Sequence, residues 1–224
     1  MNVLLFGATG MIGQGVLREC LLDDRVDSVL AVVRRPLGFS HPKLRELVHR
    51  DFTDFSSVAG EFADIDACFF CLGVSSAGLS AEEYRRITYD YTLAAARALP
   101  ARPGLTFTYV SGEGTDSTER GRSAWARVKG RTENDLLAMP FHTYVFRPGY
   151  IHPLHGARSR TPLYRRLYAA SSWLYPLLRR VAPKYVTTTE ALGRAMLAVA
   201  ERGGTGEHVL HSPEINGAAA DRRP

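Results

Sequence analysis

The feature that most constrains the fold is a glycine-rich turn close to the start of the chain. An apolar run from Val3 to Phe6 leads directly into this turn, and a helix-like segment follows it. At this spacing one glycine makes a tight turn, one lets backbone N–H groups approach a pyrophosphate, and one lets the helix pack close to the sheet. The pyrophosphate would lie at the positive end of the helix. The turn therefore predicts a dinucleotide site formed by Gly7, Ala8, Thr9, Gly10, Met11, Ile12 and Gly13.

The rest of the chain alternates short apolar runs with helix-like segments, which is typical of βαβ units around a parallel sheet. The runs are almost continuously apolar, as expected of strands that are covered on both faces. The expected strands are Asn2–Phe6, Ser28–Val33, Glu46–His49, Ala67–Leu72, Thr106–Ser111, His142–Phe146 and Glu207–Leu210. The expected helices are Met11–Leu22, Ala81–Leu99, Ala124–Ala138, Pro162–Val181 and Glu190–Arg202. We therefore expect one α/β domain over residues 1–224, a doubly wound parallel sheet with a small helical cap, and a frayed tail from Asn216.

The end of the second expected strand indicates which dinucleotide is bound. Sites that prefer NAD usually place an Asp or Glu there, which accepts hydrogen bonds from the ribose hydroxyls. This chain has Arg34 and Arg35 instead, and guanidinium groups bind a 2′-phosphate in bidentate fashion. The alternative is that one arginine stacks on the adenine while the other is solvated. We expect Arg34 and Arg35 to bind the cofactor and NADP(H) to be preferred over NAD(H).

The third expected strand is followed by Asp51 and Phe52, which we also assign to the cofactor site. A carboxylate at this position can accept a hydrogen bond from the adenine amino group. The alternative for Asp51 is that it caps a turn or a helix, as Asp side chains commonly do.

Composition narrows the class of protein. No run approaches the roughly 20 apolar residues of a membrane-spanning helix, and no signal peptide is recognisable, so we expect a cytoplasmic protein. The Cys-x-x-Cys pair Cys68 and Cys71 lies in an expected buried strand, and we interpret both as core residues. We expect no metal site, because no Cys or carboxylate spacing supports the scattered histidines His152, His155 and His211.

The net charge of +5 is concentrated in one region. The interval between Asp135 and Glu190 has no acidic residue and holds eight basic ones: Arg147, Arg158, Arg160, Arg165, Arg166, Arg179, Arg180 and Lys184. A regional charge argues against a general nucleic-acid binder. We interpret residues 150–186 as a helical, basic segment on the substrate side, with its arginines in solvent. The alternatives are a pocket for an anionic substrate, and contact of residues 158–184 with an anionic membrane or an acidic partner.

Four segments together carry a resemblance to a known family. They are the Gly7–Gly13 turn, Phe70-Cys71-Leu72-Gly73, Tyr109-Val110-Ser111 and Arg147-Pro148-Gly149. With them the chain resembles the short-chain dehydrogenase/reductase superfamily, and within it the atypical and extended NAD(P)-dependent epimerase/dehydratase-like proteins. The resemblance implies a Rossmann fold in which Leu72 and Gly73 border the cofactor and Ser111 orients the substrate. It also implies that Arg147 and Pro148 lie beside the nicotinamide.

The family's catalytic pair departs from its usual form here. That pair is Tyr-x-x-x-Lys, in which the Lys binds the nicotinamide ribose and lowers the pKa of the Tyr, so that the phenol exchanges a proton with the substrate. Lys129 stands at the Lys position, but Trp125 stands at the Tyr position. An indole N–H donates a hydrogen bond and has no accessible proton to transfer. The ordinary proton relay through this position is therefore excluded.

Three explanations for Trp125 compete. The first is that another group supplies the proton: Tyr150 is the best candidate, although it can equally be an aromatic that lines the pocket, and the others are Tyr144, His152 and Glu113. The second is that the protein binds NADP(H) without turnover. The third is an activated quinone or enone substrate, for which Ser111 and Trp125 need only donate hydrogen bonds to the developing oxyanion. We assign Ser111, Lys129 and Tyr150 to catalysis, and Glu113, Trp125 and Tyr150 to the substrate pocket.

These features favour an NADP(H)-dependent oxidoreductase that acts on a small carbonyl, enone or quinone-like substrate. A catalytically inactive NADP(H)-binding regulator or scaffold is the principal alternative. An epimerase or dehydratase of nucleotide sugars is a third, disfavoured because the chain after residue 150 is short and the base is missing. We expect a small-molecule substrate, and the sequence is compatible with an oligomer.

Overall fold

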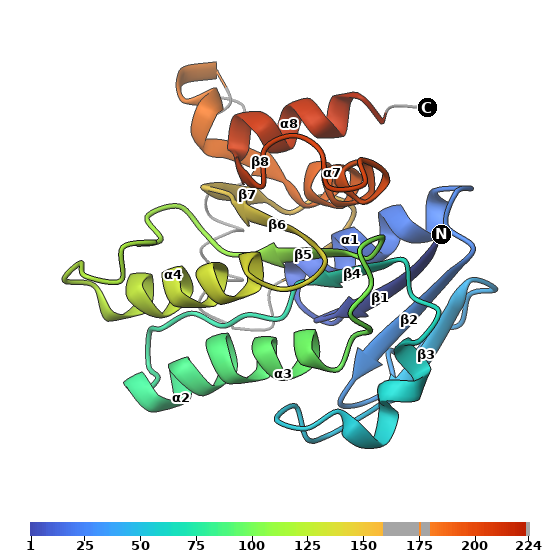
Figure 1. The fold of residues 1–224 in the computed structure, drawn as a ribbon. Helices are drawn as coiled ribbons and strands as arrows, with labels where there is room; N and C mark the ends of the chain where they lie inside the picture. Colours follow the sequence, from blue (N-terminus) through green and yellow to red (C-terminus); the bar gives the residue numbers. More distant parts are fainter. Residues whose placement is uncertain (159–174, 176–179, 223–224) are drawn as a thin grey trace.

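The strands form a seven-stranded sheet in the order β3-β2-β1-β4-β5-β6-β9. The computed structural model describes residues 1–158, 175 and 180–222. Every neighbouring pair of strands in this sheet is parallel. The strands are β1 (Asn2–Phe6), β2 (Ser28–Val33), β3 (Leu44–Val48), β4 (Ala67–Phe70), β5 (Thr106–Val110), β6 (His142–Arg147) and β9 (Val209–His211). The doubly wound α/β fold is therefore confirmed (Figure 1).

Helices cover both faces of the sheet (Figure 1). One face carries α1 (Met11–Leu22), α7 (Thr189–Glu201) and α8 (Ser212–Ala220). The other carries α2 (Ala81–Arg85), α3 (Tyr91–Arg97), α4 (Ala124–Leu137) and the 3-10 helix η1 (Ser56–Phe62). Successive strand side chains point to opposite faces, so Leu5 and Phe69 pack in the first core while Leu4 and Phe70 pack in the second.

The helix expected over Ala81–Leu99 is present but is not regular. It begins after Ser80, whose side chain accepts a hydrogen bond from the backbone N–H of Glu83. A π-helical turn, η2 (Arg86–Asp90), separates α2 from α3, and the helical stretch ends at Arg97. Apolar periodicity does not distinguish such a turn from α-helix, which is why the sequence predicts one uniform helix.

The segment expected to be helical from residue 150 to residue 186 begins and ends in strand instead. Strand β7 (Tyr150–His152) pairs in parallel with β8 (Val186–Thr188), and a 3-10 helix, η4 (Pro183–Tyr185), precedes β8. The β-branched run at 186–188 favours this extended form. Most of the expected helix Pro162–Val181 lies outside the described residues, as do four of the eight basic residues, Arg160, Arg165, Arg166 and Arg179. In the part of the chain that is described, no helix is long and apolar enough to cross a membrane.

The prediction of a frayed tail from Asn216 is wrong. Residues Ser212–Ala220 form α8, which buries Ile215, Ala218 and Ala219 against the sheet. The Asn216 amide donates to the carbonyl of Val186 at 2.9 Å and accepts from Thr187 Oγ1 at 2.8 Å. The small residues that suggest disorder in the sequence allow this helix to pack closely.

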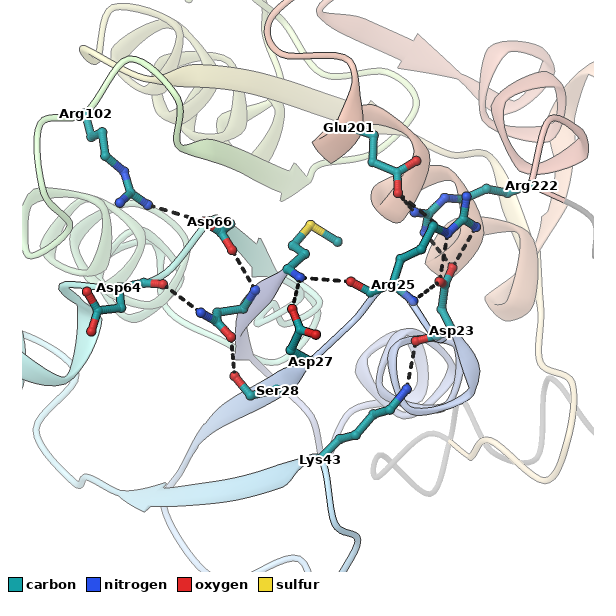
Figure 2. Close-up of polar contacts among 12 residues, drawn as sticks. Asp23, Arg25, Asp27, Ser28, Lys43, Asp64, Asp66, Arg102, Glu201 and Arg222 are labelled. Carbon is teal, nitrogen blue, oxygen red and sulfur yellow. Dashed lines mark hydrogen bonds and ion pairs between the residues drawn. The ribbon is translucent and has the colours of Figure 1, made fainter.

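A polar network joins the end of the described chain to the amino-terminal edge of the sheet (Figure 2). The Arg222 side chain is 3% exposed and donates to Asp23 Oδ2 at 2.8 Å and to Glu201. Arg25 binds the same Asp23 carboxylate, and the Lys43 ammonium donates to the Asp23 carbonyl at 2.8 Å. The turn between α1 and β2 is thereby tied to the end of α7 and to Arg222, two residues beyond the end of α8.

Candidate functional site

The sequence-predicted residues gather at the carboxyl edge of the sheet, because all seven strands are parallel. The strand order reverses between β1 and β4, and in such sheets ligands bind in the crevice outside this switch point. Gly7, which follows β1, lies against the chain that leaves β4. A β-carbon at Gly7 would be 2.6 Å from the backbone N of Leu72. Leu72 is partly buried and Gly73 is exposed at this crevice.

The glycine turn has a shape that side chains would block. Gly7 has φ of +82°, and its carbonyl accepts a hydrogen bond from the N–H of Gly10 at 2.9 Å. A β-carbon at Gly13 would lie 2.0 Å from the Gly7 carbonyl oxygen, so only glycine allows α1 to approach the turn this closely. Gly10 is the N-cap of α1 and offers no side chain to the first-turn N–H groups, and that turn has no acidic residue. The turn therefore fits the pyrophosphate of a dinucleotide.

Gln14, which the sequence analysis did not single out, ties a distant loop to this turn. Its side-chain nitrogen donates to the carbonyl of Thr9 at 3.0 Å and to that of Arg158 at 3.2 Å. Its side-chain oxygen accepts from the N–H of Arg158 at 3.1 Å. The loop that follows β7 is thus held beside the first turn of α1.

The two arginines after β2 are exposed, and neither makes an ion pair or hydrogen bond with any described residue. No carboxylate follows the strand directly, but Glu46 on β3 accepts a hydrogen bond from the N–H of Leu37 at 3.0 Å. The guanidinium groups of Arg34 and Arg35 are therefore unpaired within the described chain, at the edge where the adenosine end of a dinucleotide would lie.

Asp51 and Phe52 have structural contacts of their own after β3. The Asp51 carboxylate accepts from the N–H of Thr53 at 2.9 Å and from its hydroxyl, and these hydrogen bonds hold the pKa of Asp51 below its usual value. Phe52 is buried, with its ring centroid 6.3 Å from that of Phe6. Asp51 thus caps a turn, which is the alternative that its position in the sequence already allowed.

The chain leaving β5 forms a compact turn around Ser111. Ser111 is 8% exposed, its N–H donates to the carbonyl of Phe146, and its hydroxyl lies 3.0 Å from that of Thr115. The N–H of Glu113 donates to the carbonyl of Pro148 at 3.1 Å. The turn 111–115 is therefore folded across the end of β6.

Trp125 lies against this same turn. A β-carbon at Gly114 would be 3.4 Å from Cη2 of the indole, and Gly114 has φ of +80°. Trp125 is partly buried in the first turn of α4. The position that carries the family's tyrosine thus faces the Ser111 turn, as the resemblance implies.

Lys129 lies one helical turn further along α4. Its ammonium nitrogen is 5.7 Å from the centre of the Tyr109 ring, on β5. Burial lowers the pKa of Lys129 to about 8, while the Glu133 carboxylate acts in the opposite direction. Within the described chain its ammonium has no carboxylate or carbonyl hydrogen-bond partner. A desolvated ammonium with free donors can bind ribose hydroxyls.

Arg147 is the last residue of β6, and Pro148 follows it. The Arg147 guanidinium donates through Nε to Glu133 at 3.1 Å and through Nη2 to Glu133 and to Ser117. Glu133 is 1% exposed, so this pair fixes α4 against β6. The Pro148 carbonyl is bound by Glu113, and Tyr150 is partly buried at the start of β7. Of these residues, Arg147 is bound to Glu133 on α4, whereas Tyr150 lies in the small second sheet.

A pair of titratable side chains at this edge escaped the sequence analysis. Nδ1 of His211, the last residue of β9, donates to Oε2 of Glu113 at 3.0 Å. The expected strand stopped at Leu210, and His211 was considered only as a metal ligand. The sequence signal that could have identified His211 was its position at the end of an expected parallel strand. Among the described residues no cluster of three His, Cys, Asp or Glu side chains could hold a metal ion.

Comparison with known proteins identifies the family. A sequence profile of the NAD dependent epimerase/dehydratase family matches residues 3–116. The mitochondrial protein FMP52 of Saccharomyces cerevisiae is 30% identical over 72% of this chain and 69% of its own length. FMP52 of Candida albicans is 24% identical over 92% of this chain and 91% of its own length. HTATIP2 of Rattus norvegicus is 29% identical over 67% of this chain and 62% of its own length, so the chain spans only part of some relatives.

Solved structures share the fold at low sequence identity. A short chain dehydrogenase/reductase family oxidoreductase from Burkholderia thailandensis superposes with a TM-score of 0.70 at 18% identity, over 97% of this chain and 92% of that one. MoeE5 in complex with UDP-glucose and NAD superposes with a TM-score of 0.64 at 19% identity, over 99% of this chain and 81% of that one. These likenesses extend the family fold beyond the residues that the profile matches.

The comparisons correct one prediction and confirm another. The FMP52 relatives are named mitochondrial, which contradicts the cytoplasmic location expected from the sequence. That expectation rested on the apparent absence of a signal peptide, which does not distinguish between compartments inside a cell. The family resemblance is confirmed: the chain belongs to the NAD dependent epimerase/dehydratase family and is an NAD(P)-binding Rossmann protein of the short-chain dehydrogenase/reductase type.

Proposed function

We propose that this protein is an NADP(H)-dependent oxidoreductase that reduces a small carbonyl, enone or quinone-like compound. The observation that carries the proposal is the surroundings of Lys129. A half-buried ammonium without a carboxylate bound to it is costly unless a ligand uses it, and it lies on the helix turn that follows Trp125. Ser111 at the end of β5 completes the family's arrangement of serine and lysine.

The cofactor preference rests on the second strand. Arg34 and Arg35 are exposed and unpaired within the described chain, so they can bind a 2′-phosphate without first breaking an ion pair. The bound cofactor supplies the hydride. The residues of the chain bind the pyrophosphate at the Gly7–Gly13 turn, the ribose at Lys129 and the substrate oxygen at Ser111.

Trp125 favours a second candidate function, an NADP(H)-binding regulator without turnover. An indole cannot relay a proton, so a protein that has lost catalysis would tolerate it. The two candidates differ in whether NADPH is consumed in the presence of a substrate.

Restoring the missing phenol hydroxyl at position 125 distinguishes the oxidoreductase from the regulator. Trp125→Tyr places a phenol one helical turn before Lys129 and should raise kcat for NADPH-dependent reduction by at least about 100-fold, the low end of general-acid effects. Trp125→Phe is the matched control, because it changes the size of the side chain without adding a proton donor. The assay follows NADPH absorbance across aldehydes, ketones, enones and quinones.

The proposal expects wild-type turnover with at least one of these substrates, and loss of that turnover in Lys129→Ala. Tight NADPH binding with no consumption in the wild type or in Trp125→Tyr would instead establish the regulator. Equal activity of the Tyr and Phe variants would contradict the role assigned to position 125.

A further inference from the structure

The missing tyrosine leaves a reductase without an obvious proton donor, and the described residues offer one. His211 is 44% exposed and Glu113 is 46% exposed, and they form an ion pair or hydrogen bond at the carboxyl edge of the sheet. We infer that His211, held by Glu113, donates the proton to the substrate oxygen in place of the absent tyrosine. This inference rests on the proposed reductase function.

The first step of the argument is position. Glu113 belongs to the turn that begins at Ser111 and that packs against Trp125 through Gly114. Glu113 therefore lies in the same turn as the serine that would hold the substrate oxygen, and the next residue of that turn packs on the indole that replaces the family's acid.

The second step is the chain that leaves β6. The Pro148 carbonyl accepts from the N–H of Glu113 at 3.1 Å, and the Gly149 N–H donates to Oγ of Ser212 at 3.1 Å. Ser212 follows His211 directly, so the two members of the pair flank the Pro148–Gly149 segment. The family resemblance expects this segment to border the nicotinamide, which is where the proton is needed.

The third step is the arrangement of the imidazole. Its Nδ1 donates to the Glu113 carboxylate, an arrangement that fixes the orientation of the ring. Nε2 has no hydrogen-bond partner within the described chain and remains for a substrate. The charged groups nearest to His211 are Glu113, Glu214, which accepts from the His211 N–H at 2.9 Å, and Arg147, its register neighbour on β6. Arg147 is bound to Glu133, so the side chain that contacts the imidazole is the Glu113 carboxylate.

The chemistry balances with these groups. When bound, the reduced nicotinamide would supply a hydride, which carries both electrons, to the substrate carbonyl carbon. The carbonyl oxygen takes the proton from Nε2 of protonated His211, so an O–H bond forms and an N–H bond breaks. Neutral imidazole then takes a proton from solvent water. Glu113 orients the ring and remains a carboxylate throughout.

The kinetic test uses His211→Gln and Glu113→Gln in the full chain, with His41→Gln at the opposite edge of the sheet as control. Proton donation should appear as a fall of kcat/KM with rising pH in the wild type. We expect His211→Gln to lower kcat by about 100-fold and to remove that fall, while the Kd of NADPH is unchanged. Glu113→Gln should have a smaller effect of the same kind.

Rescue distinguishes proton supply from a structural role. The double variant Trp125→Tyr/His211→Gln should keep nearly the activity of Trp125→Tyr, because the phenol replaces the imidazole as donor. A merely structural histidine would lower kcat in the Trp125→Tyr background by as large a factor as in the wild type. The role of the Glu113–His211 pair as proton donor is refuted if His211→Gln keeps the kcat/KM and the pH profile of the wild type on a substrate that the wild type reduces.

A binding readout keeps the inference testable apart from turnover. The imidazole NMR signal of His211, assigned by its absence in His211→Gln, should shift when NADP⁺ saturates the protein, whereas that of His41 should not. Saturation by NADP⁺ without a shift at His211 would place the ring away from the nicotinamide and refute the inference. If neither NADPH nor NADP⁺ binds the wild type, the proposed function itself is refuted, and the role inferred for the Glu113–His211 pair is refuted with it.

Discussion

Lys129 and Trp125 stand one turn apart on α4 and have different surroundings. The indole packs on the Ser111 turn, while the ammonium lies above the Tyr109 ring, with its pKa lowered to about 8 by burial. Glu133, a further turn along, is bound by Arg147 and so offers Lys129 only partial compensation. At the residue scale, the chain keeps a half-buried cation at a cost in free energy, although the phenol whose pKa it would lower is absent.

This cost predicts a pH-dependent stability. The pKa of Lys129 is about 8 in the folded chain, against 10.5 for an exposed lysine. Between these values the unfolded chain holds a proton that the folded chain has released, so unfolding takes up a proton and becomes less favourable as pH rises. Relative to Lys129→Met, the free energy of unfolding of the wild type should rise by about 1 kcal/mol per pH unit above pH 8.

Urea unfolding of both proteins without cofactor, in steps from pH 7 to pH 10, measures this difference. Below pH 8 lysine is protonated in both states, and the difference should be constant. Parallel stabilities across the whole range would mean that Lys129 is solvated.

Individual elements were predictable where local chemistry alone determines them. The bounds of β1, α1 and β2 match the prediction, because a short apolar strand, a glycine turn and a helix follow one another without interruption. The small sheet of β7 and β8 was not predicted, since it pairs segments far apart in sequence and each strand has three residues. Helix α8 was missed because Gly217 disfavours a helix, whereas the burial of Ile215, Ala218 and Ala219 that stabilises α8 depends on tertiary packing.

The residues of the candidate site divide in the same way, into those that local sequence predicts and those that depend on tertiary contacts. The residues at the ends of β1, β2, β4 and β5 were predictable, because parallel strands bring their carboxyl ends together. The contacts of Gln14 with Arg158, and of Glu113 with His211, depend on tertiary structure that no local pattern encodes. Among the predicted residues, Arg147 proved to have a protein partner that its sequence position did not indicate. The turn capped by Asp51 was an alternative that the sequence allowed.

The loop after β7 supplies a prediction for one element. Gln14→Leu keeps the size of the side chain but removes its hydrogen bonds to both backbone groups of Arg158. Because such a bond contributes about 1 kcal/mol, hydrogen exchange at the Arg158 amide should accelerate several-fold. Gln14→Glu is the matched control: its carboxylate still accepts from the Arg158 N–H, so exchange should remain slower than in Gln14→Leu.

Exchange is followed by NMR at the Arg158 amide, with the Val26 amide, which donates to the Asp23 carbonyl at 3.0 Å, as internal reference. Unchanged exchange at Arg158 in Gln14→Leu would show that Gln14 does not hold the loop beside the turn.

At the scale of the whole molecule, the two edges of the sheet have different tasks. The amino-terminal edge is tied together by Asp23, Arg25, Glu201 and Arg222, and it joins α1, α7 and the end of α8 (Figure 2). The carboxyl edge carries the glycine turn, the unpaired arginines and the Glu113–His211 pair. The seven parallel strands between them hold the candidate site on a rigid base while leaving its loops free to differ among relatives.

The central claim is that the carboxyl edge binds NADP(H) through the Gly7–Gly13 turn and the arginines after β2. Calorimetric titration with NADPH and NADH, of the wild type and of Arg34→Ala/Arg35→Ala, tests it most directly. We predict that NADPH binds the wild type at least about tenfold more tightly than NADH, a difference of about 1.4 kcal/mol, and that the double variant loses this difference while still binding NADH. Equal affinity of the wild type for both dinucleotides, or no binding of either, would contradict the account.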